Sequence, residues 1–239
     1  MTRFFLEPDQ LLSDTVTLIG ENAQHAKVLR LKPGEEILVC DGQGMACLCA
    51  LEEGMTFRVI QRRPCENEAA VKVSVYMAFP KADKLEHVIQ KATELGAWEI
   101  VAFPSARCVS RPDEKSLKKK QERWQKIAAS AAEQSGRGII PQVVILSSFR
   151  EALERGAQTD LPIMFYENEH ATTLKMALEQ TKFRSVSILS GPEGGLEEKE
   201  VQAAQQAGFR ICTLGRRILR CETAPLCGLS AIMFAAGEF

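Results

Sequence analysis

The sequence contains no apolar run long enough to cross a bilayer, which argues against a transmembrane protein. Its first ten residues lack the basic start, the apolar stretch and the small-residue cleavage site of a signal peptide. The 239 residues, with 45% hydrophobic and 26% charged side chains, suffice for one large domain or two modest ones. We therefore predict a globular protein of the cytoplasm with no membrane partner.

Cysteine and histidine are not spaced for a metal site. The eight cysteines include no C-x-x-C pair, and none lies at zinc-finger spacing from a histidine. The three histidines, His25, His87 and His170, are scattered. We expect reduced cysteines, several of them buried as small apolar residues, and no bound metal.

The net charge of −1 does not indicate a nucleic-acid partner, but the basic residues are clustered. Between Arg107 and Lys126 there are eight basic and three acidic residues, a local excess of five. Arg216, Arg217 and Arg220 form a second cluster. A third cluster consists of Arg3, Lys27, Arg30 and Lys32. One cluster alone would be an ordinary solvated surface, whereas three in a nearly neutral chain favour an anionic partner.

The first part of the chain has the pattern of a small β domain. Short β-like runs at Glu36–Cys40, Met45–Leu51 and Thr56–Ile60 are separated by glycine-containing turns, and one helical segment covers Glu21–Leu31. Short strands with tight turns and a single helix predict a compact β-barrel. The mixed-charge segment Arg62–Ala70 is then a linker.

After Val71 the pattern changes to strands that alternate with helices. The predicted strands are Val73–Phe79, Ile100–Phe103, Val143–Leu146, Ile163–Tyr166, Val186–Leu189 and Arg210–Leu214. Such alternation predicts an α/β domain with a largely parallel sheet covered on both faces. The predicted domains are therefore residues 1–70 and 71–239.

Two loops have an unusual composition. In open α/β sheets, ligands bind beyond the carboxyl ends of strands, where Ser190–Gly195 (SGPEGG) and Leu214–Arg220 (LGRRILR) lie. The first loop is neither a P-loop nor a dinucleotide fingerprint, but its glycines allow a flat ligand to approach the backbone. The alternative is a plain strand-to-helix turn. In the second loop, Ile218 and Leu219 lie among arginines, which predicts a pocket with apolar walls and a charged mouth.

Together these loops resemble a known ligand-binding signature. Ser190–Gly195 with Leu214–Ala224 (LGRRILRCETA) is similar to that of the SPOUT superfamily of trefoil-knotted methyltransferases, and within it to the bacterial 16S ribosomal RNA uridine N3-methyltransferase family. Lys81–Ala97, Arg123–Arg137 and His25–Gly42 also agree, so the resemblance spans nearly the whole chain.

The resemblance implies a fold, a cofactor and a reaction. The fold would be an N-terminal PUA-like β-barrel plus a C-terminal SPOUT α/β domain with a deep trefoil knot, dimerised through the knot region. The enzyme would use S-adenosylmethionine to methylate N3 of a specific uridine in the decoding region of 16S rRNA, on the small ribosomal subunit. The implied donor-binding residues are Ser190, Gly191, Pro192, Glu193, Gly194, Gly195, Leu214, Gly215, Ile218, Leu219, Thr223 and Ala224. Cys221 and Pro225 are local departures from the motif.

The ionisable residues of the two loops are the catalytic candidates. We expect Arg220 to stabilise negative charge on the uracil, and Glu222 or Glu193 to accept or relay its proton. Alternatively, Glu222 is an N-cap or a first-turn charge of the last helix, Glu193 shapes its loop, and Arg220 binds a phosphate or pairs with a carboxylate. The predicted RNA-binding residues are Arg3, Lys27, Arg30, Lys32, Arg123 and Lys126.

Two other functions fit parts of the pattern. One is a non-catalytic RNA-binding or ribosome-assembly protein that kept the fold, against which the intact SGPEGG and ILRCETA loops argue. The other is a SPOUT methyltransferase acting on another RNA, such as transfer RNA 2′-hydroxyls. The pattern of the first domain argues against this second alternative, but less strongly.

Overall fold

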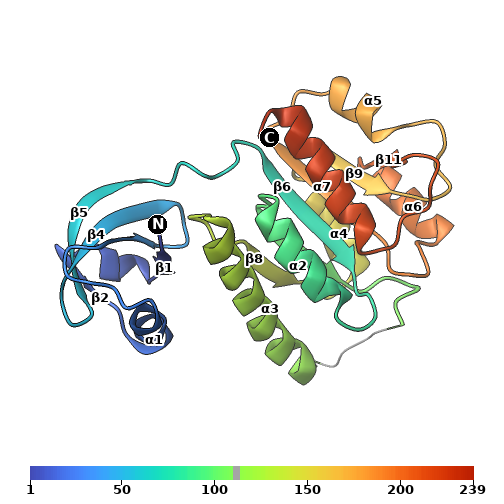
Figure 1. Cartoon of the computed structure of the whole chain (residues 1–239). Coiled ribbons are helices and arrows are strands. Elements are labelled where there is room, and N and C mark those ends of the chain that lie inside the picture. Colours follow the sequence, from blue (N-terminus) through green and yellow to red (C-terminus); the bar gives the residue numbers. More distant parts are fainter. Residues whose placement is uncertain (110–113) are drawn as a thin grey trace. The chain divides into compact units, whose positions relative to one another are not determined.

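The computed structural model describes residues 1–109 and 114–239 (Figure 1), so Arg111 and Asp113 of the predicted basic cluster lie outside the described residues. Two compact units are present, Met1–Glu68 with Ala132–Ile140, and Ala69–Ala131 with Pro141–Phe239. No helix in the described ranges combines the length and apolar character that a membrane span requires. Nor do three or more metal-binding side chains gather anywhere in this part of the chain.

The first unit is built on a five-stranded sheet of order β1-β3-β4-β5-β2. Its elements are β1 (Arg3–Phe5), a 3-10 helix (Pro8–Leu11), β2 (Thr15–Thr17), α1 (Gly20–Val28), β3 (Glu36–Cys40), β4 (Met45–Glu53) and β5 (Thr56–Pro64). Strands β3, β4 and β5 and helix α1 confirm the three strands and the one helical segment that were predicted for this part of the chain. The predicted linker starts too early, because Arg62, Arg63 and Pro64 continue β5 opposite β4. The exposed, charged side chains of the two arginines hide the strand pattern.

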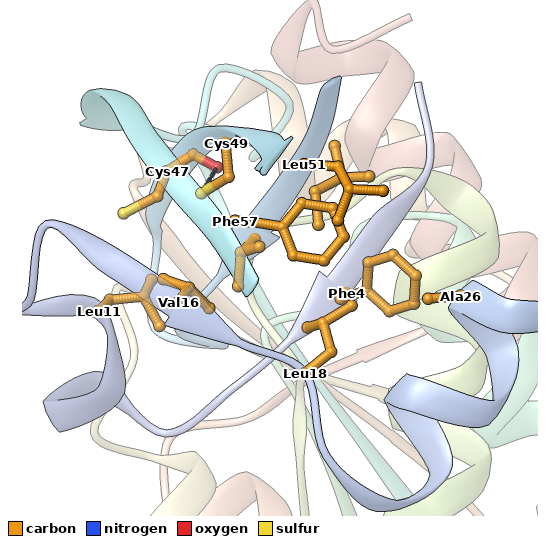
Figure 2. Close-up of a cluster of buried hydrophobic side chains, with 11 residues drawn as sticks. Phe4, Leu11, Val16, Leu18, Ala26, Cys47, Cys49, Leu51 and Phe57 are labelled. Atoms are coloured by element: carbon orange, nitrogen blue, oxygen red, sulfur yellow. Dashed lines mark hydrogen bonds between the residues drawn. The ribbon is translucent and has the colours of Figure 1, made fainter. Parts of the chain in front are cut away.

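The core of this unit comes from alternate residues of the strands (Figure 2). Ile37 and Val39 of β3 and Cys47, Cys49 and Leu51 of β4 all lie in one buried cluster, as period-two side chains on one face of a sheet should. The cluster is completed by Phe4, Leu11, Val16, Leu18, Ala26 and Phe57. The buried Cys47 and Cys49 confirm that several cysteines are small core residues.

The Ala132–Ile140 segment is joined to the first unit by a buried carboxylate. Glu68 accepts hydrogen bonds from Arg137 Nε at 3.1 Å and Nη2 at 2.7 Å, and from the backbone N–H groups of Gly138 and Ile139 at 2.7 and 2.9 Å. The Arg137 and Glu68 side chains are only 5% and 14% exposed. Removing one partner would leave the other as an uncompensated buried charge.

Arg137→Met should therefore destabilise the first unit by about 3–5 kcal/mol. Hydrogen exchange of the β3–β5 amides measures this loss as reduced protection. Arg63→Met is the matched control, because Arg63 pairs with Glu66 at 2.8 Å on the surface and should cost no more than about 1 kcal/mol. Equal protection in the two variants would contradict the role of the Glu68–Arg137 pair.

The second unit has a six-stranded sheet of order β11-β9-β10-β6-β7-β8, and every described pair in it is parallel. The strands are β6 (Lys72–Ala78), β7 (Glu99–Phe103), β8 (Gln142–Ile145), β9 (Leu161–Phe165), β10 (Ser185–Ser190) and β11 (Arg210–Cys212). The parallel α/β domain is thus confirmed. The apolar runs identified these strands because a strand covered on both faces has little polar alternation.

Helices cover the sheet of the second unit on both faces (Figure 1). They are α2 (Lys84–Glu94), α3 (Glu114–Ser135), α4 (Phe149–Gly156), α5 (Leu174–Glu179), α6 (Glu198–Gln206) and α7 (Thr223–Ala236). Helix α7 packs on α2, β6 and β10. Trp124 of α3 is buried and belongs to the core. Because all strands are parallel, their carboxyl ends lie at one edge, to which the two unusual loops belong.

Candidate functional site

The SGPEGG loop leaves β10 at the carboxyl edge of the sheet. Gly195 donates its N–H to Pro192 O at 2.9 Å, and Ser190 Oγ donates to Tyr76 O at 3.3 Å on the neighbouring strand β6. Gly195 has a φ of +70°, which favours glycine. A Cβ on Gly191 would come within 3.0 Å of Leu196 Cγ. The glycines are therefore required by this tight turn as well as being suited to a close ligand.

The second loop, residues 213–222, joins β11 to α7 and leaves apolar surface uncovered. Gly215 has a φ of +112°, and a Cβ built on it would meet nothing within 4 Å. Ile218 is 86% exposed, and Leu219 is half-buried. An open backbone position beside an exposed aliphatic side chain is compatible with the predicted apolar wall of a ligand pocket.

A third loop, residues 166–173 after β9, lies between the other two. The sheet order places β9 between β10 and β11. Tyr166 N donates to Cys212 O at 3.1 Å, and Thr213 N donates to Thr172 O at 2.9 Å. On the other side, the Glu167 carboxylate occupies the space that a Cβ on Gly195 would need. Sequence reasoning missed this loop, because its place in the site depends on the strand order.

Lys84, at the start of α2, brings the two predicted carboxylates together. Its Nζ lies 3.0 Å from Glu193 Oε1 and 3.2 Å from Glu222 Oε2. Glu193 Oε1 also accepts the N–H of Lys81 at 3.0 Å. Cys221 Sγ donates to Glu222 Oε2 at 3.2 Å. One lysine thus connects the SGPEGG loop to the start of α7. The only sequence signal for this lysine was its place in the Lys81–Ala97 motif.

These contacts keep both carboxylates ionised. Burial opposes the charge of Glu193, but its own backbone N–H and Lys84 outweigh burial and lower its pKa. Burial likewise opposes the charge of Glu222, whereas its own backbone N–H, the Cys221 thiol and Lys84 lower its pKa. The hydrogen bond to Glu193 raises the pKa of Lys84. Burial, followed by the bond to Glu222, raises the pKa of the Cys221 thiol to about 12.

The remaining candidates lie at or just before the start of α7. Glu222 stands at the N-cap position of α7 but makes no capping hydrogen bond with its side chain, so it is not a side-chain N-cap. Arg220 is exposed, and its guanidinium forms no hydrogen bond or ion pair with the described residues. Thr223 and Ala224 donate their N–H groups to Arg220 O at 2.9 and 3.0 Å, which starts α7.

The predicted RNA-binding residues are not all equally available. Arg3 donates to Gly136 O and is half-buried, and Arg123 pairs with Glu86 at 2.7 Å. The other four are exposed, as Arg123 also is, namely Lys27, Arg30 and Lys32 around the end of α1 and Lys126 on α3. Arg30 has a φ of +53°, which lies in a backbone region that residues other than glycine seldom adopt.

Comparison with known proteins adds two family matches. Residues 67–233 match a family model described as an RNA methyltransferase domain, and residues 18–55 match an RNA methyltransferase PUA domain. Ribosomal RNA small subunit methyltransferase E of Bacillus subtilis is 38% identical, over 98% of this chain and 96% of its own.

Solved structures agree along the same length. The ribosomal RNA small subunit methyltransferase E of Neisseria gonorrhoeae, bound to S-adenosyl methionine, is 33% identical with a TM-score of 0.84, over 98% of this chain and 97% of its own. A structure from Legionella pneumophila, which also contains bound SAM, is 26% identical with a TM-score of 0.85, over 98% of both chains.

Proposed function

Because this chain belongs to the RNA methyltransferase family, we propose that it transfers a methyl group from S-adenosylmethionine to N3 of a specific uridine in the decoding region of 16S rRNA. The observation that carries the proposal is the match along the whole chain to relatives named for methylating small-subunit rRNA, one of them solved with the donor bound. The protein would act in the cytoplasm on the small ribosomal subunit.

The donor site is proposed at the carboxyl edge of the second unit's sheet. The open backbone at Gly215, the exposed Ile218 and the glycine turn at residues 190–195 fit a flat nucleoside with an apolar edge. Backbone groups of both loops would hold the adenosine, with Leu214, Leu219, Thr223 and Ala224 completing the pocket. When bound, S-adenosylmethionine supplies a methyl group on a positively charged sulfur.

The residues of this chain would prepare the uracil for attack. N3 carries a proton at neutral pH, so the base must become anionic at or before attack. Arg220, whose guanidinium is exposed, would stabilise the charge that develops on a uracil oxygen. Glu222, with its lowered pKa, would hold the proton only briefly and would act as a relay rather than a store. Fixed positions of both partners would contribute part of the roughly 7–11 kcal/mol available from orientation.

Two observations support the proposed knot and dimer, the path of the chain and an exposed apolar end of α7. After β10 the chain reaches β11, which pairs with β9, and α7 then returns to pack on β10 and β6. This return of the chain toward β10 and β6 is compatible with the proposed knot. Helix α7 also leaves Phe234 73% exposed beside the exposed Ala235 and Ala236. We propose that a second copy of this chain covers this apolar end of α7.

Residues 1–70 are proposed as the RNA-binding domain and 71–239 as the catalytic one. Lys27, Arg30 and Lys32 would contact phosphates and fix the register of the RNA without reading its sequence. Lys126, and Arg123 where its pair with Glu86 opens, would be separate phosphate contacts on α3. Arg3 contributes mainly by holding the carbonyl of Gly136.

Arg30→Gly should weaken RNA binding without lowering the free energy of unfolding. A left-handed backbone costs a side-chain-bearing residue roughly 1–2 kcal/mol, so glycine should leave the free energy of unfolding unchanged or slightly higher. The same change should weaken rRNA binding and reduce the slope of log K against log salt by about 0.7–0.9, as for one lost phosphate contact. Filter binding across a salt series measures this slope. An unchanged slope would contradict the proposed phosphate contact. A lower free energy of unfolding would contradict the argument from the left-handed backbone.

The proposed reaction is tested with small ribosomal subunits that lack the modification. Incubation with labelled S-adenosylmethionine, followed by nucleoside mass spectrometry, should yield 3-methyluridine. A methylated ribose would establish a different target for the same fold. Donor binding without any product would reject the assigned substrate, and the absence of donor binding would favour the non-catalytic alternative.

A further inference from the structure

We infer that Glu167, in the loop after β9, binds a positively charged group of the methyl donor's methionyl part. This inference rests on the proposed function, since it needs the donor to lie at the carboxyl edge of the sheet. It adds a third loop to the proposed site and a carboxylate that, unlike Glu193 and Glu222, is not paired with Lys84.

The position of Glu167 follows from strand order. The SGPEGG loop follows β10 and the arginine-rich loop follows β11, and β9 lies between these strands in the sheet. Backbone hydrogen bonds join the β9 loop to β11 at Tyr166–Cys212 and Thr213–Thr172. A ligand that spans the two outer loops must therefore pass the β9 loop.

The Glu167 side chain is directed toward the SGPEGG loop. Its carboxylate lies where a Cβ of Gly195 would be, so any residue other than glycine at 195 would displace it. Position 195 thus requires glycine for two reasons, because its φ is +70° and because the Glu167 carboxylate fills the space that a Cβ would need. Together they bring a carboxylate into contact with the backbone that is proposed to hold the donor.

Glu167 differs from the carboxylates of the adjoining segments in having no partner among the described residues. Glu193 and Glu222 share Lys84. Glu198 accepts a hydrogen bond from Tyr166 Oη at 3.2 Å, and Glu197 pairs with Lys199 at 2.8 Å. The Glu167 carboxylate is exposed and forms no hydrogen bond or ion pair with the described residues.

The arginine that binds the SGPEGG loop does not supply such a partner. Arg107 Nη1 donates to Gly194 O at 3.0 Å, and its charge acts on Glu197. The neighbours of Glu167 in its own loop are also turned away, because Asn168 Nδ2 donates to Tyr166 Oη at 3.1 Å and Tyr166 faces α6. An unpaired carboxylate at a ligand site selects a cation. The donor carries two such groups, the sulfonium and the α-ammonium.

Calorimetric titration of three ligands tests the inference. S-Adenosylmethionine carries both cations, S-adenosylhomocysteine carries only the ammonium, and 5′-methylthioadenosine carries neither. Glu167→Gln should weaken S-adenosylmethionine binding about 10- to 100-fold, as expected for a lost contact between opposite charges, and leave methylthioadenosine binding unchanged. An equal loss for S-adenosylhomocysteine assigns the ammonium, and a loss for S-adenosylmethionine alone assigns the sulfonium.

Matched variants and the remaining outcomes complete the test. Glu198→Gln removes a neighbouring carboxylate that is bonded to Tyr166 and should leave all three affinities unchanged. Glu167→Asp keeps the charge and should retain more affinity than Glu167→Gln. Unchanged donor binding, an equal loss for all three ligands, or a loss of turnover alone would overturn the inference. If the wild-type protein binds no donor, the proposed function itself fails.

Discussion

Arg220→Ala should lower kcat for methyl transfer about 10²–10³-fold, the usual effect of removing one preorganised donor from a developing oxyanion. The affinity for S-adenosylmethionine should stay within about twofold, because the adenosine is proposed to be held by backbone groups. The basis is that Arg220 has an exposed guanidinium with no partner among the described residues, directly before the Cys221–Glu222 pair that Lys84 holds. Single-turnover rates and calorimetric donor binding on the same sample measure the two effects separately.

Two variants distinguish this effect from a general loss of positive charge. Arg217→Ala, in the same loop, should raise KM for the ribosomal substrate and its salt dependence while changing kcat little, as expected of a phosphate contact. Arg220→Lys should recover only part of the rate, because an ammonium cannot reproduce the planar fork of a guanidinium. If Arg220→Ala and Arg217→Ala have the same kinetic effect, Arg220 is one of several phosphate contacts and has no specific catalytic role.

The sequence predicted the parts of the fold that depend on local pattern. Runs such as Val186–Leu189 marked buried parallel strands, and their glycine-rich or arginine-rich ends marked the two loops of the site. By contrast, the three-residue strands β1 and β2 were not predicted, because so few residues show no period. The helical pattern of α3 runs unbroken to Ser135, so nothing in it shows that residues 132–140 group with the first unit.

The same distinction applies to the candidate site. Glu193 and Glu222 were found because they lie in the loops themselves, whereas the lysine that neutralises both is far away in sequence, on α2. Glu167 was missed since its role depends on β9 lying between β10 and β11, and periodicity does not encode the order of strands. That Glu222 or Glu193 accepts or relays a proton stays a prediction made from side-chain type, and it did not foresee Lys84, which contributes to their lowered pKa values.

Lys84→Met should lower kcat/KM about 10²-fold, which is the scale expected when groups at a reacting centre move by about 1 Å. Without the ammonium, two carboxylates that now lie 3.0 and 3.2 Å from Nζ would repel each other, and the SGPEGG loop would lose its ion pair to α2. The donor affinity should fall together with the rate, unlike in Arg220→Ala. Lys91→Met is the control, because it removes an α2 lysine whose partner, Glu94, lies on the same helix and outside the site.

The pH dependence of this variant gives a second measurement. In the wild type the pKa values of Glu193 and Glu222 are lowered, so the contribution of the ion pairs is complete above the ordinary carboxyl value near 4.5 and is lost as pH falls through the lowered values. Without Lys84 both pKa values should rise, because burial and the second carboxylate then oppose ionisation. Donor affinity in Lys84→Met should therefore decline at a higher pH than in the wild type. An acid limb at the same pH in both proteins would show that Lys84 does not set the charge of these carboxylates, and that the link between the two loops lies elsewhere.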